Sequence, residues 1–252
     1  KKDNISFTFK FPELKPYFKK ILNFSSYAFL GSFSNIIVLN VDVLMVTSLL
    51  GLSQTGVYTT AFYIGMIIEI PRRAISQISI PFISENIKNQ KIKKIESYYK
   101  EISLHQTIIG VLFYLLVIIN IDYIFNLIPN SENFISGKNV VYVIGFSKLI
   151  IMFFSFNSEI ISLSKYYRFT VVTIIILAII SIILNLILIP IYGMIGAALA
   201  SFISLLIFNL IKHIFIKLKM KISPFSINTL KVILIGIILF TIDYYSMPAL
   251  SN

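Results

Sequence analysis

Residues 185–201 read NLILIPIYGMIGAALAS, a strongly apolar stretch that is interrupted by Pro190 and Gly193. The stretch lies inside a run of 43 residues, 169–211, that holds no charged side chain. As one helix this run would be about 65 Å long, whereas the hydrocarbon core of a bilayer is about 30 Å thick and takes about 20 residues. Proline disfavours helix at the preceding residue, and glycine permits a tight turn. The sequence therefore predicts a hairpin of two membrane-spanning helices with its tip at 190–193.

The composition is that of an integral membrane protein. Hydrophobic residues make up 57% of the chain and charged residues 13%, with a mean hydropathy of +0.86. A soluble domain carries about 25% charged residues, roughly twice as many. Only helices and closed barrels span lipid, and long unalternating apolar runs are not typical of barrel strands. We therefore expect an all-α integral membrane protein.

No catalytic or metal-binding constellation is present in the sequence. Cysteine is absent, which excludes disulfides and thiolate metal sites. The two histidines, His105 and His213, are isolated from one another. We find no nucleophile elbow, phosphate loop or paired-carboxylate pattern, and we expect no enzyme activity, metal or cofactor.

Seven transmembrane helices are predicted from the apolar runs. They cover residues 21–50, 57–83, 102–121, 140–163, 169–189, 194–216 and 230–247. Pro71 predicts a kink in the second span, and Asp243 makes the last span the weakest. The lysine-rich connection 85–101 is interpreted as a short amphipathic helix at an anionic membrane surface.

The basic residues alternate between the connections. One set of connections holds eighteen of the 22 Lys and Arg residues, and the other set holds only Lys138. The eighteen are Lys1, Lys2, Lys10, Lys15, Lys19, Lys20, Lys88, Lys91, Lys93, Lys94, Lys100, Lys165, Arg168, Lys212, Lys217, Lys219, Lys221 and Lys231. Because positive loops stay in the cytoplasm, we expect segment 1–20 to be cytoplasmic and the 190–193 tip to lie outside. The net charge of +11 then requires no nucleic-acid partner.

Three segments resemble a known family. NLILIPIYGMIGAALASFIS, at 185–204, resembles a signature late in the polysaccharide flippases of the MOP (multidrug/oligosaccharidyl-lipid/polysaccharide) superfamily. LNVDVLMVTSLLGLSQTGVYTTAFYI, at 39–64, resembles an earlier stretch of the same proteins, and residues 72–81 followed by Ser84 resemble a helix of that family.

The resemblance implies a fold, a function and partners. Members have twelve or fourteen helices in two lobes, and this chain, which begins without Met, resembles the C-terminal lobe over residues 21–250. The family exports lipid-linked oligosaccharides by alternating access. The implied partners are therefore an undecaprenyl-pyrophosphate-type glycolipid, membrane lipids of a bacterial inner membrane and a missing N-terminal lobe.

Charges inside the spans are the strongest functional signal, because a charge at mid-helix costs about 2.5–3.5 kcal/mol on insertion scales. Arg72 and Arg73 lie in the second span, three and four residues after Glu69. Adjacent side chains diverge by about 100° on a helix, so one arginine can pair with Glu69 while the other faces a cavity and binds pyrophosphate. Lys148 is either a second anion contact or a side chain that extends to the membrane surface.

Two acidic residues have competing interpretations. Glu159 is expected to form an interfacial salt bridge with Lys165 or Arg168, with a proton relay as the alternative. Asp42 is expected to pair with Arg72 or Arg73 or to cap a helix break beside Gly51, with a coupling-ion role as the alternative.

Small residues after the hairpin tip are interpreted as a packing face. Spacings of four let helices approach closely, and Asn185 is expected to hydrogen-bond to a neighbouring helix. The tip and packing residues are Asn185, Pro190, Gly193, Gly196, Ala197, Ala200 and Ser201.

Other functions remain open from sequence alone. A drug or metabolite antiporter of the same superfamily is expected to favour acidic cavity residues over arginines. A membrane-embedded glycan polymerase or ligase usually has a large external loop, which is not predicted here. A structural membrane scaffold has no need of arginines inside its spans.

Overall fold

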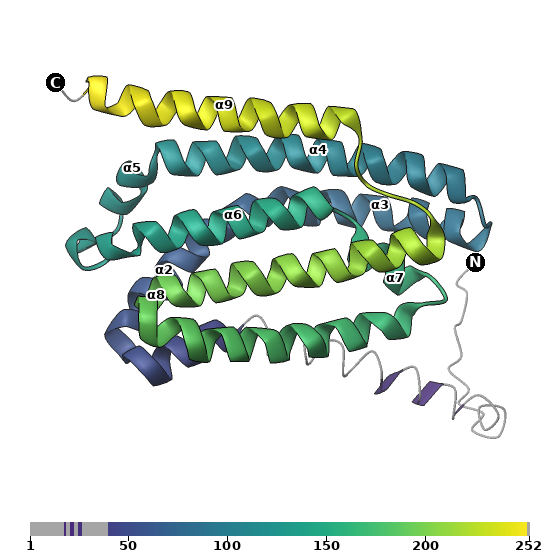
Figure 1. Cartoon of the computed structure of the whole chain (residues 1–252), viewed down its shortest axis with the longest axis horizontal. Helices are drawn as coiled ribbons and strands as arrows, with labels where there is room; N and C mark the ends of the chain where they lie inside the picture. Colours follow the sequence, from purple (N-terminus) through teal and green to yellow (C-terminus); the bar gives the residue numbers. More distant parts are fainter. Residues whose placement is uncertain (1–17, 19–20, 23–24, 27–39, 251–252) are drawn as a thin grey trace, which may run out of the picture.

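The computed structural model describes residues 18, 21–22, 25–26 and 40–250, and every regular element between residues 40 and 250 is a helix (Figure 1). The first is the helix Asn40–Leu50. It is followed by α2 (Leu52–Met66), the 3₁₀ turn η1 (Ile67–Glu69), α3 (Ile70–Lys88), α4 (Ile92–Ile119), α5 (Ile121–Asn126), η2 (Ser131–Asn133), η3 (Ile135–Gly137), α6 (Lys138–Phe154), α7 (Asn157–Leu163), α8 (Tyr167–Met220) and α9 (Ile227–Leu250). The predicted all-α fold is confirmed.

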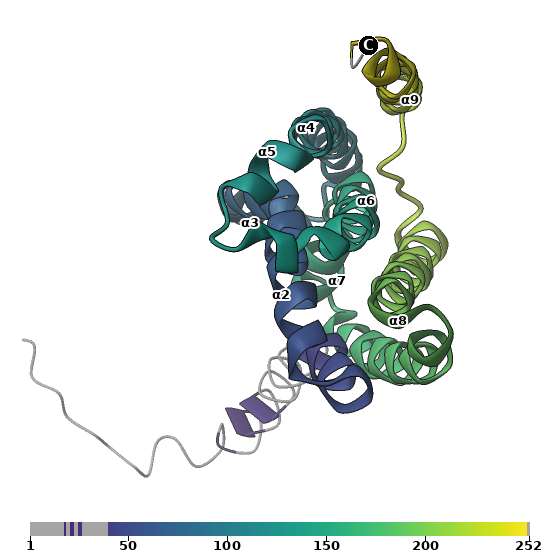
Figure 2. The same ribbon diagram turned by 90° about the vertical axis from the view of Figure 1, so that its left-hand side faces the viewer.

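The predicted hairpin is present within α8, whose two arms run side by side in opposite directions (Figures 1 and 2). The chain reverses at Gly193, where φ is 59° and ψ is −137°, a conformation essentially limited to glycine. Pro190 stays inside the first arm, so the turn is sharper than the predicted tip of four residues. A proline near a helix end is tolerated in membranes, because nearby groups satisfy the freed carbonyl.

Gly196 closes this hairpin. A Cβ atom built on Gly196 would overlap the backbone oxygen of Leu188 on the first arm. The two arms therefore approach at a distance that only a residue without a side chain permits.

Two predicted spans are interrupted, one as expected and one unexpectedly. The second bends at the 3₁₀ turn Ile67–Glu69, directly before Pro71, which agrees with the predicted kink. The fourth was predicted as one helix over 140–163, but it breaks at Ser155, where φ is 52° and ψ is −119°. No proline or glycine marks this break in the sequence.

The predicted separate helix at 85–101 is wrong. α3 continues to Lys88, a turn with Gln90 at φ 54° follows, and α4 already begins at Ile92. Lysine, glutamate and tyrosine are compatible with helix, so both long helices extend beyond their apolar parts. Of the first predicted span, only Asn40–Leu50 and four isolated residues belong to the described residues. The predicted segment 1–20 lies outside them apart from Phe18.

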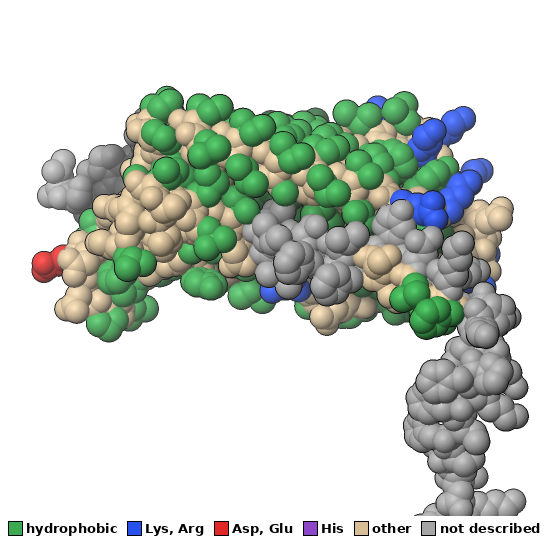
Figure 3. Space-filling view, turned by 90° about the horizontal axis from the view of Figure 1, so that it is seen from below, with side chains coloured by type: hydrophobic (Ala, Val, Ile, Leu, Met, Phe, Trp, Pro, Cys, Tyr) green, Lys and Arg blue, Asp and Glu red, His purple; other side chains and the backbone are tan. Residues whose placement is uncertain are grey.

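The described basic connections gather at one end of the bundle. The α3–α4 turn, the α7–α8 connection and the α8–α9 connection all lie at the right in Figure 1, and Figure 3 shows lysine and arginine side chains concentrated toward that end. α5 and the tip of α8 lie at the opposite end. The alternation found in the sequence therefore corresponds to a physical asymmetry of the bundle.

The surface between the two ends is largely apolar (Figure 3). Among the described residues, three helices are long and apolar enough to cross a membrane, α4, the segment Ile135–Phe154 and α8, and α8 is long enough to cross twice. Two buried hydrophobic clusters fill the interior. One is built around Ile68, Ile144 and Ala197, and the other, nearer the basic end, is built around Ile83, Ile160 and Ile216.

Candidate functional site: two buried charged clusters

A buried ion network connects the two broken helices. Glu69 accepts from Arg72 Nη1 at 3.3 Å through Oε1 and from Lys148 Nζ at 3.2 Å through Oε2. The second guanidinium nitrogen of Arg72, Nη2, reaches Glu159 Oε1 at 3.1 Å. The network therefore joins η1, α3, α6 and α7, and its two positive charges balance its two negative charges.

Helix breaks place these side chains. Glu69 ends the 3₁₀ turn before α3, and Glu159 lies in α7, a helix of seven residues that begins directly after the break at Ser155. Each break redirects a helix, so that residues 87 positions apart, Arg72 and Glu159, become neighbours. The partner of Glu159 is thus Arg72, and the expected bridge to Lys165 or Arg168 is wrong.

Lys148 is only 5% exposed in its side chain and also lies over the ring of Phe62, 5.5 Å from its centroid. It does not extend to the membrane surface, so that interpretation is excluded.

A further cation, Lys212, lies next to the network and was not singled out in the sequence. Its side chain is 1% exposed, its Nζ donates to Ser158 Oγ at 2.8 Å, and it lies 3.5 Å from the ring centroid of Phe208. The sequence assigned Lys212 to the basic connection after the sixth span, because it bounds the charge-free run. The long second arm of α8 keeps it inside instead.

Arg73 has a different environment from Arg72. Its side chain is exposed and forms no ion pair with any described residue. It lies on the exposed side of α3 with Ile70, which is three residues earlier and 60% exposed. The geometry expected for adjacent arginines is therefore present, with one paired to Glu69 and the other pointing away.

Asp42 forms the second buried charged cluster. Its carboxylate accepts hydrogen bonds from Asn185 Nδ2 at 2.8 Å, from Ser181 Oγ at 3.5 Å and from the hydroxyl of Ser201. Asn185 and Ser181 belong to the first arm of α8, and Ser201 belongs to the second. Asp42 is 4% exposed and forms no ion pair with a described residue.

The expected partners of Asp42 are therefore wrong. It does not bind Arg72 or Arg73. It also does not cap the helix break beside Gly51, because no side chain caps the start of α2 there. The hydrogen bond expected of Asn185 reaches Asp42, so the block of small residues after the tip does more than pack. Ala197 and Ala200 are fully buried, whereas Ser201 supplies a hydroxyl to the carboxylate.

The cluster around Asp42 retains unused hydrogen-bonding capacity. Asn185 Oδ1 and the hydroxyl of the fully buried Tyr58 have no hydrogen-bond partner among the described residues. The described residues contain no group of three His, Cys, Asp or Glu side chains that could hold a metal ion. One carboxylate with neutral oxygens suits a proton or a small monovalent cation better than Ca²⁺ or Mg²⁺.

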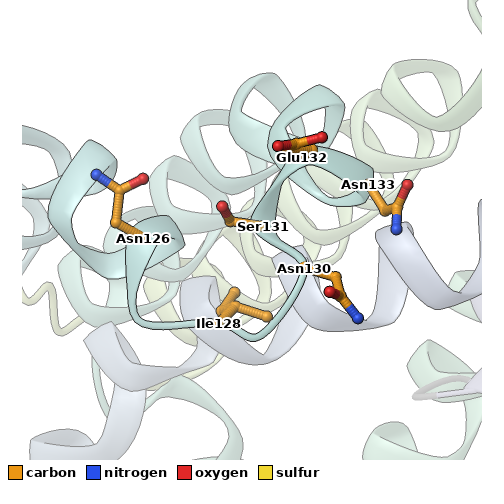
Figure 4. A pocket seen from close by; sticks show the side chains of 6 residues that line it. All are labelled: Asn126, Ile128, Asn130, Ser131, Glu132 and Asn133. Atoms are coloured by element: carbon orange, nitrogen blue, oxygen red, sulfur yellow. The ribbon is translucent and has the colours of Figure 1, made fainter.

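A polar pocket of about 430 Å³ lies in the loop at the end opposite the lysines (Figure 4). The residues that line it run from the end of α5 through η2: Asn126, Ile128, Asn130, Ser131, Glu132 and Asn133. None of these residues was predicted as a site, and the pocket shares no residue with the ion network or with the cluster around Asp42.

Comparison with known proteins gives one family and two structures. Residues 4–128 match the model of a family described as "Polysaccharide biosynthesis protein". No curated protein matches the chain. A multidrug resistance MATE family transporter of the MOP superfamily, solved in an outward-facing conformation, matches 85% of this chain and 50% of its own, with a TM-score of 0.65 and 19% identity. A MOP superfamily transporter from Pyrococcus furiosus matches 86% of this chain and 50% of its own, with a TM-score of 0.58 and 17% identity.

The chain has the fold of one lobe of a MOP superfamily transporter. It spans about half the length of the two solved structures that it matches. The family resemblance and the predicted transporter-lobe fold are therefore confirmed. The prediction of a multi-pass membrane protein is supported as well. The family match includes Asp42, Glu69, Arg72 and Arg73, and it ends before Lys148 and the α8 hairpin.

Proposed function

We propose that this lobe, together with a second lobe, moves lipid-linked oligosaccharides of the undecaprenyl-pyrophosphate type across a bacterial cell membrane. The proposal is supported by the match to a polysaccharide biosynthesis family and by the transporter fold. The sugar passes between the lobes while the lipid tail remains in the bilayer, and no covalent bond is formed or broken. The basic end of the bundle faces the cytoplasm, as the positive-inside rule requires.

The exposure of Arg73 is the single observation that best supports this proposal. An arginine near the middle of a span costs about 2.5–3.5 kcal/mol on insertion scales if it faces lipid, and Arg73 lies near the middle of the predicted second span, 57–83. The face of α3 that holds Arg73 is covered by no described element. We therefore place this face at the cavity between the lobes, where a guanidinium can bind phosphate oxygens in a bidentate manner.

The ion network supports Arg73 from behind. Glu69 and Glu159 neutralise Arg72 and Lys148, while Arg73 and Lys212 remain as surplus positive charges beside it. An incoming pyrophosphate competes with the two carboxylates for Arg72 and Lys148. In this proposal Arg73 makes the first contact, and Arg72 and Lys148 contribute as their carboxylate partners move away.

Complementation of a strain that lacks its own polysaccharide flippase tests the substrate. The full-length protein is expressed as wild type, Arg73→Ala, Arg73→Lys and Lys100→Ala, and surface polysaccharide is measured at matched membrane levels. Loss of one charge-assisted hydrogen bond lowers export about tenfold or more in Arg73→Ala. Arg73→Lys is intermediate, because lysine is a point charge without the planar fork.

Lys100→Ala serves as the matched control, since Lys100 pairs with Glu96 on the surface at the basic end. Normal export by Arg73→Ala would contradict the anion-binding role. A wild-type protein that restores no polysaccharide but confers drug resistance would instead favour the antiporter alternative.

We also propose that Asp42 binds the coupling cation, a proton or Na⁺. A buried carboxylate that lacks a cationic partner among the described residues, next to an unpaired amide oxygen and an unpaired phenol, favours this role. The midpoint of thermal unfolding of the full-length protein is expected to rise with Na⁺ or to shift with pH in the wild type. If Asp42→Asn shows the same response, the cation is bound elsewhere.

A further inference from the structure

The buried face of α3 is polar over most of its length. Its residues recur at the spacing of one helix face, and the hydrophobic residue among them is Ile83. The polar members are Arg72, Ser76, Ser79 and Asn86, and Glu69, the last residue of η1, continues the same spacing. In a membrane bundle an inward polar face requires partners, because lipid offers none.

The side of α4 that faces the break between α6 and α7 is polar as well. α3 and α4 form an antiparallel pair whose alignment is fixed by Phe82 and Tyr98, with ring centroids 4.1 Å apart. On the buried face of α4, Ser103 Oγ donates to the carbonyl oxygen of Phe153 at 2.9 Å, and the hydroxyl of Tyr99 donates to Asn157 Oδ1. These bonds connect α4 to both sides of the break between α6 and α7.

Gln106 lies one turn beyond Ser103 on the same face, and it is fully buried. Neither its Nε2 nor its Oε1 has a hydrogen-bond partner among the described residues. The hydroxyl of Ser155, at the break two residues after Phe153, is buried and equally unpaired. So is the hydroxyl of Ser76, one turn after Arg72 on α3.

Two atoms of the ion network share this condition. Arg72 Nε and Glu159 Oε2 are buried without a partner among the described residues, although the other atoms of both groups are paired. Six unpaired polar atoms thus belong to side chains of α3, α4, α7 and the α6–α7 break, elements that the bonds described above hold together. They include donors and acceptors, and both are needed for a connected network.

We infer that internal water occupies the interior beside the α6–α7 break, bound by Gln106, Ser76 and Ser155 and extending to the Arg72–Glu159 pair. Buried water is the usual partner of polar groups that protein cannot satisfy, and burying this many donors and acceptors dry is costly. Such water lowers the cost of separating Arg72 from Glu159, because each group keeps a partner when α7 moves. The water site does not depend on what the protein transports.

Radiolytic hydroxyl-radical labelling of the full-length protein detects this water, because radicals formed from bound water modify adjacent side chains. Tyr99 and Phe125 are matched reporters, since both are buried aromatic residues and only Tyr99 lies beside the unpaired cluster. We expect Tyr99 to be labelled well above Phe125 in the wild type and to fall toward the level of Phe125 in Gln106→Leu. Equal, low labelling of the two residues in the wild type would overturn the inference.

Thermal unfolding of Gln106→Leu gives a second, independent readout. If Gln106 is dry, replacing its two unpaired polar ends with an apolar side chain raises the midpoint. If Gln106 holds water, the midpoint stays unchanged or falls. Thr107→Val is the control for substitution on the same turn, because the Thr107 hydroxyl is already satisfied by the Ser103 carbonyl oxygen at 2.7 Å. A rise in the midpoint confined to Gln106→Leu would overturn the proposal.

Discussion

The two buried charged clusters stabilise their buried charges in opposite ways. The ion network places two cations against two carboxylates, so its charges cancel. Asp42 keeps a single charge and surrounds it with an amide and two hydroxyls. Removing one member of the network leaves an opposite charge stranded, whereas neutralising Asp42 leaves no charge behind. Stability therefore depends on the integrity of the ion network. The cluster around Asp42, in contrast, can change its charge state.

The clusters also differ in how the backbone builds them. The donors to Asp42 come from both arms of the α8 hairpin, so the cluster depends on a close approach of two backbones. The ion network depends instead on two helix breaks, at Ile67–Glu69 and at Ser155. A substitution can therefore disturb one cluster and leave the other in place.

The largest effect is expected for Gly196→Ala. The added methyl group meets the backbone oxygen of Leu188, which cannot move as a side chain does, so the hairpin must open. We expect a loss of about 3 kcal/mol or more in the free energy of unfolding, at the upper end of overpacking effects. Chemical denaturation of the full-length protein in detergent measures this change.

Gly56→Ala is the control for Gly196→Ala, because nothing lies within 4 Å of the methyl group that it introduces in α2. It is expected to be neutral or stabilising by up to about 1 kcal/mol. Equal stability of the two variants would mean that the arms of α8 are not held as closely as the structure shows.

The next largest effect is expected for Glu69→Gln. Lys148 is then buried without a carboxylate, and because the Glu69 side chain keeps 12% of its surface exposed we expect a loss of about 3 kcal/mol, the lower end for a buried pair that loses one partner. The double variant Glu69→Gln with Lys148→Met removes both charges and should recover most of the loss. A double variant no more stable than Glu69→Gln would show that the Glu69–Lys148 pair does not dominate the network.

Elements that depend on local composition were predictable from the sequence. The charge-free run 169–211 with Gly193 predicted the α8 hairpin, because its length exceeds one bilayer and only glycine fits the turn. The separation of the basic connections was equally visible. Both signals can be identified along the sequence and need no knowledge of which helices become neighbours in space.

Elements that depend on distant contacts were missed. The break at Ser155 has no proline or glycine, and residues around it are held by bonds from α4, such as that from Ser103 to Phe153. The pairs Arg72–Glu159 and Asp42–Asn185 connect helices far apart in sequence. Charges inside spans indicated that partners exist, but only the packing of the helices determines which partners meet.

Asp42→Asn is expected to have a small effect on stability. Asparagine has the same shape and retains an oxygen that accepts from Asn185 Nδ2, while its new amide takes the place of the oxygen that accepts from Ser201, whose hydroxyl can rotate to accept instead. The change should stay within about 1 kcal/mol, since the weaker hydrogen bonds of a neutral amide are offset by the lower cost of burying it and no opposite charge is stranded. A loss similar to that of Glu69→Gln would show that Asp42 has a permanent cationic partner in the complete protein.

The smallest effect is expected for Lys100→Ala, which tests the contrast between buried and exposed pairs. Lys100 Nζ lies 2.8 Å from Glu96 Oε1, a shorter distance than any pair of the ion network, but the two side chains are 40% and 33% exposed. Water and salt screen an exposed pair four residues apart on a helix, so we expect a loss of about 0.3–0.5 kcal/mol that shrinks further at high salt. The free energies of unfolding of the wild type and of Lys100→Ala, measured at low and at high ionic strength, check this expected loss. A loss as large as that of Glu69→Gln would mean that proximity, rather than burial, sets the energy of ion pairs in this protein.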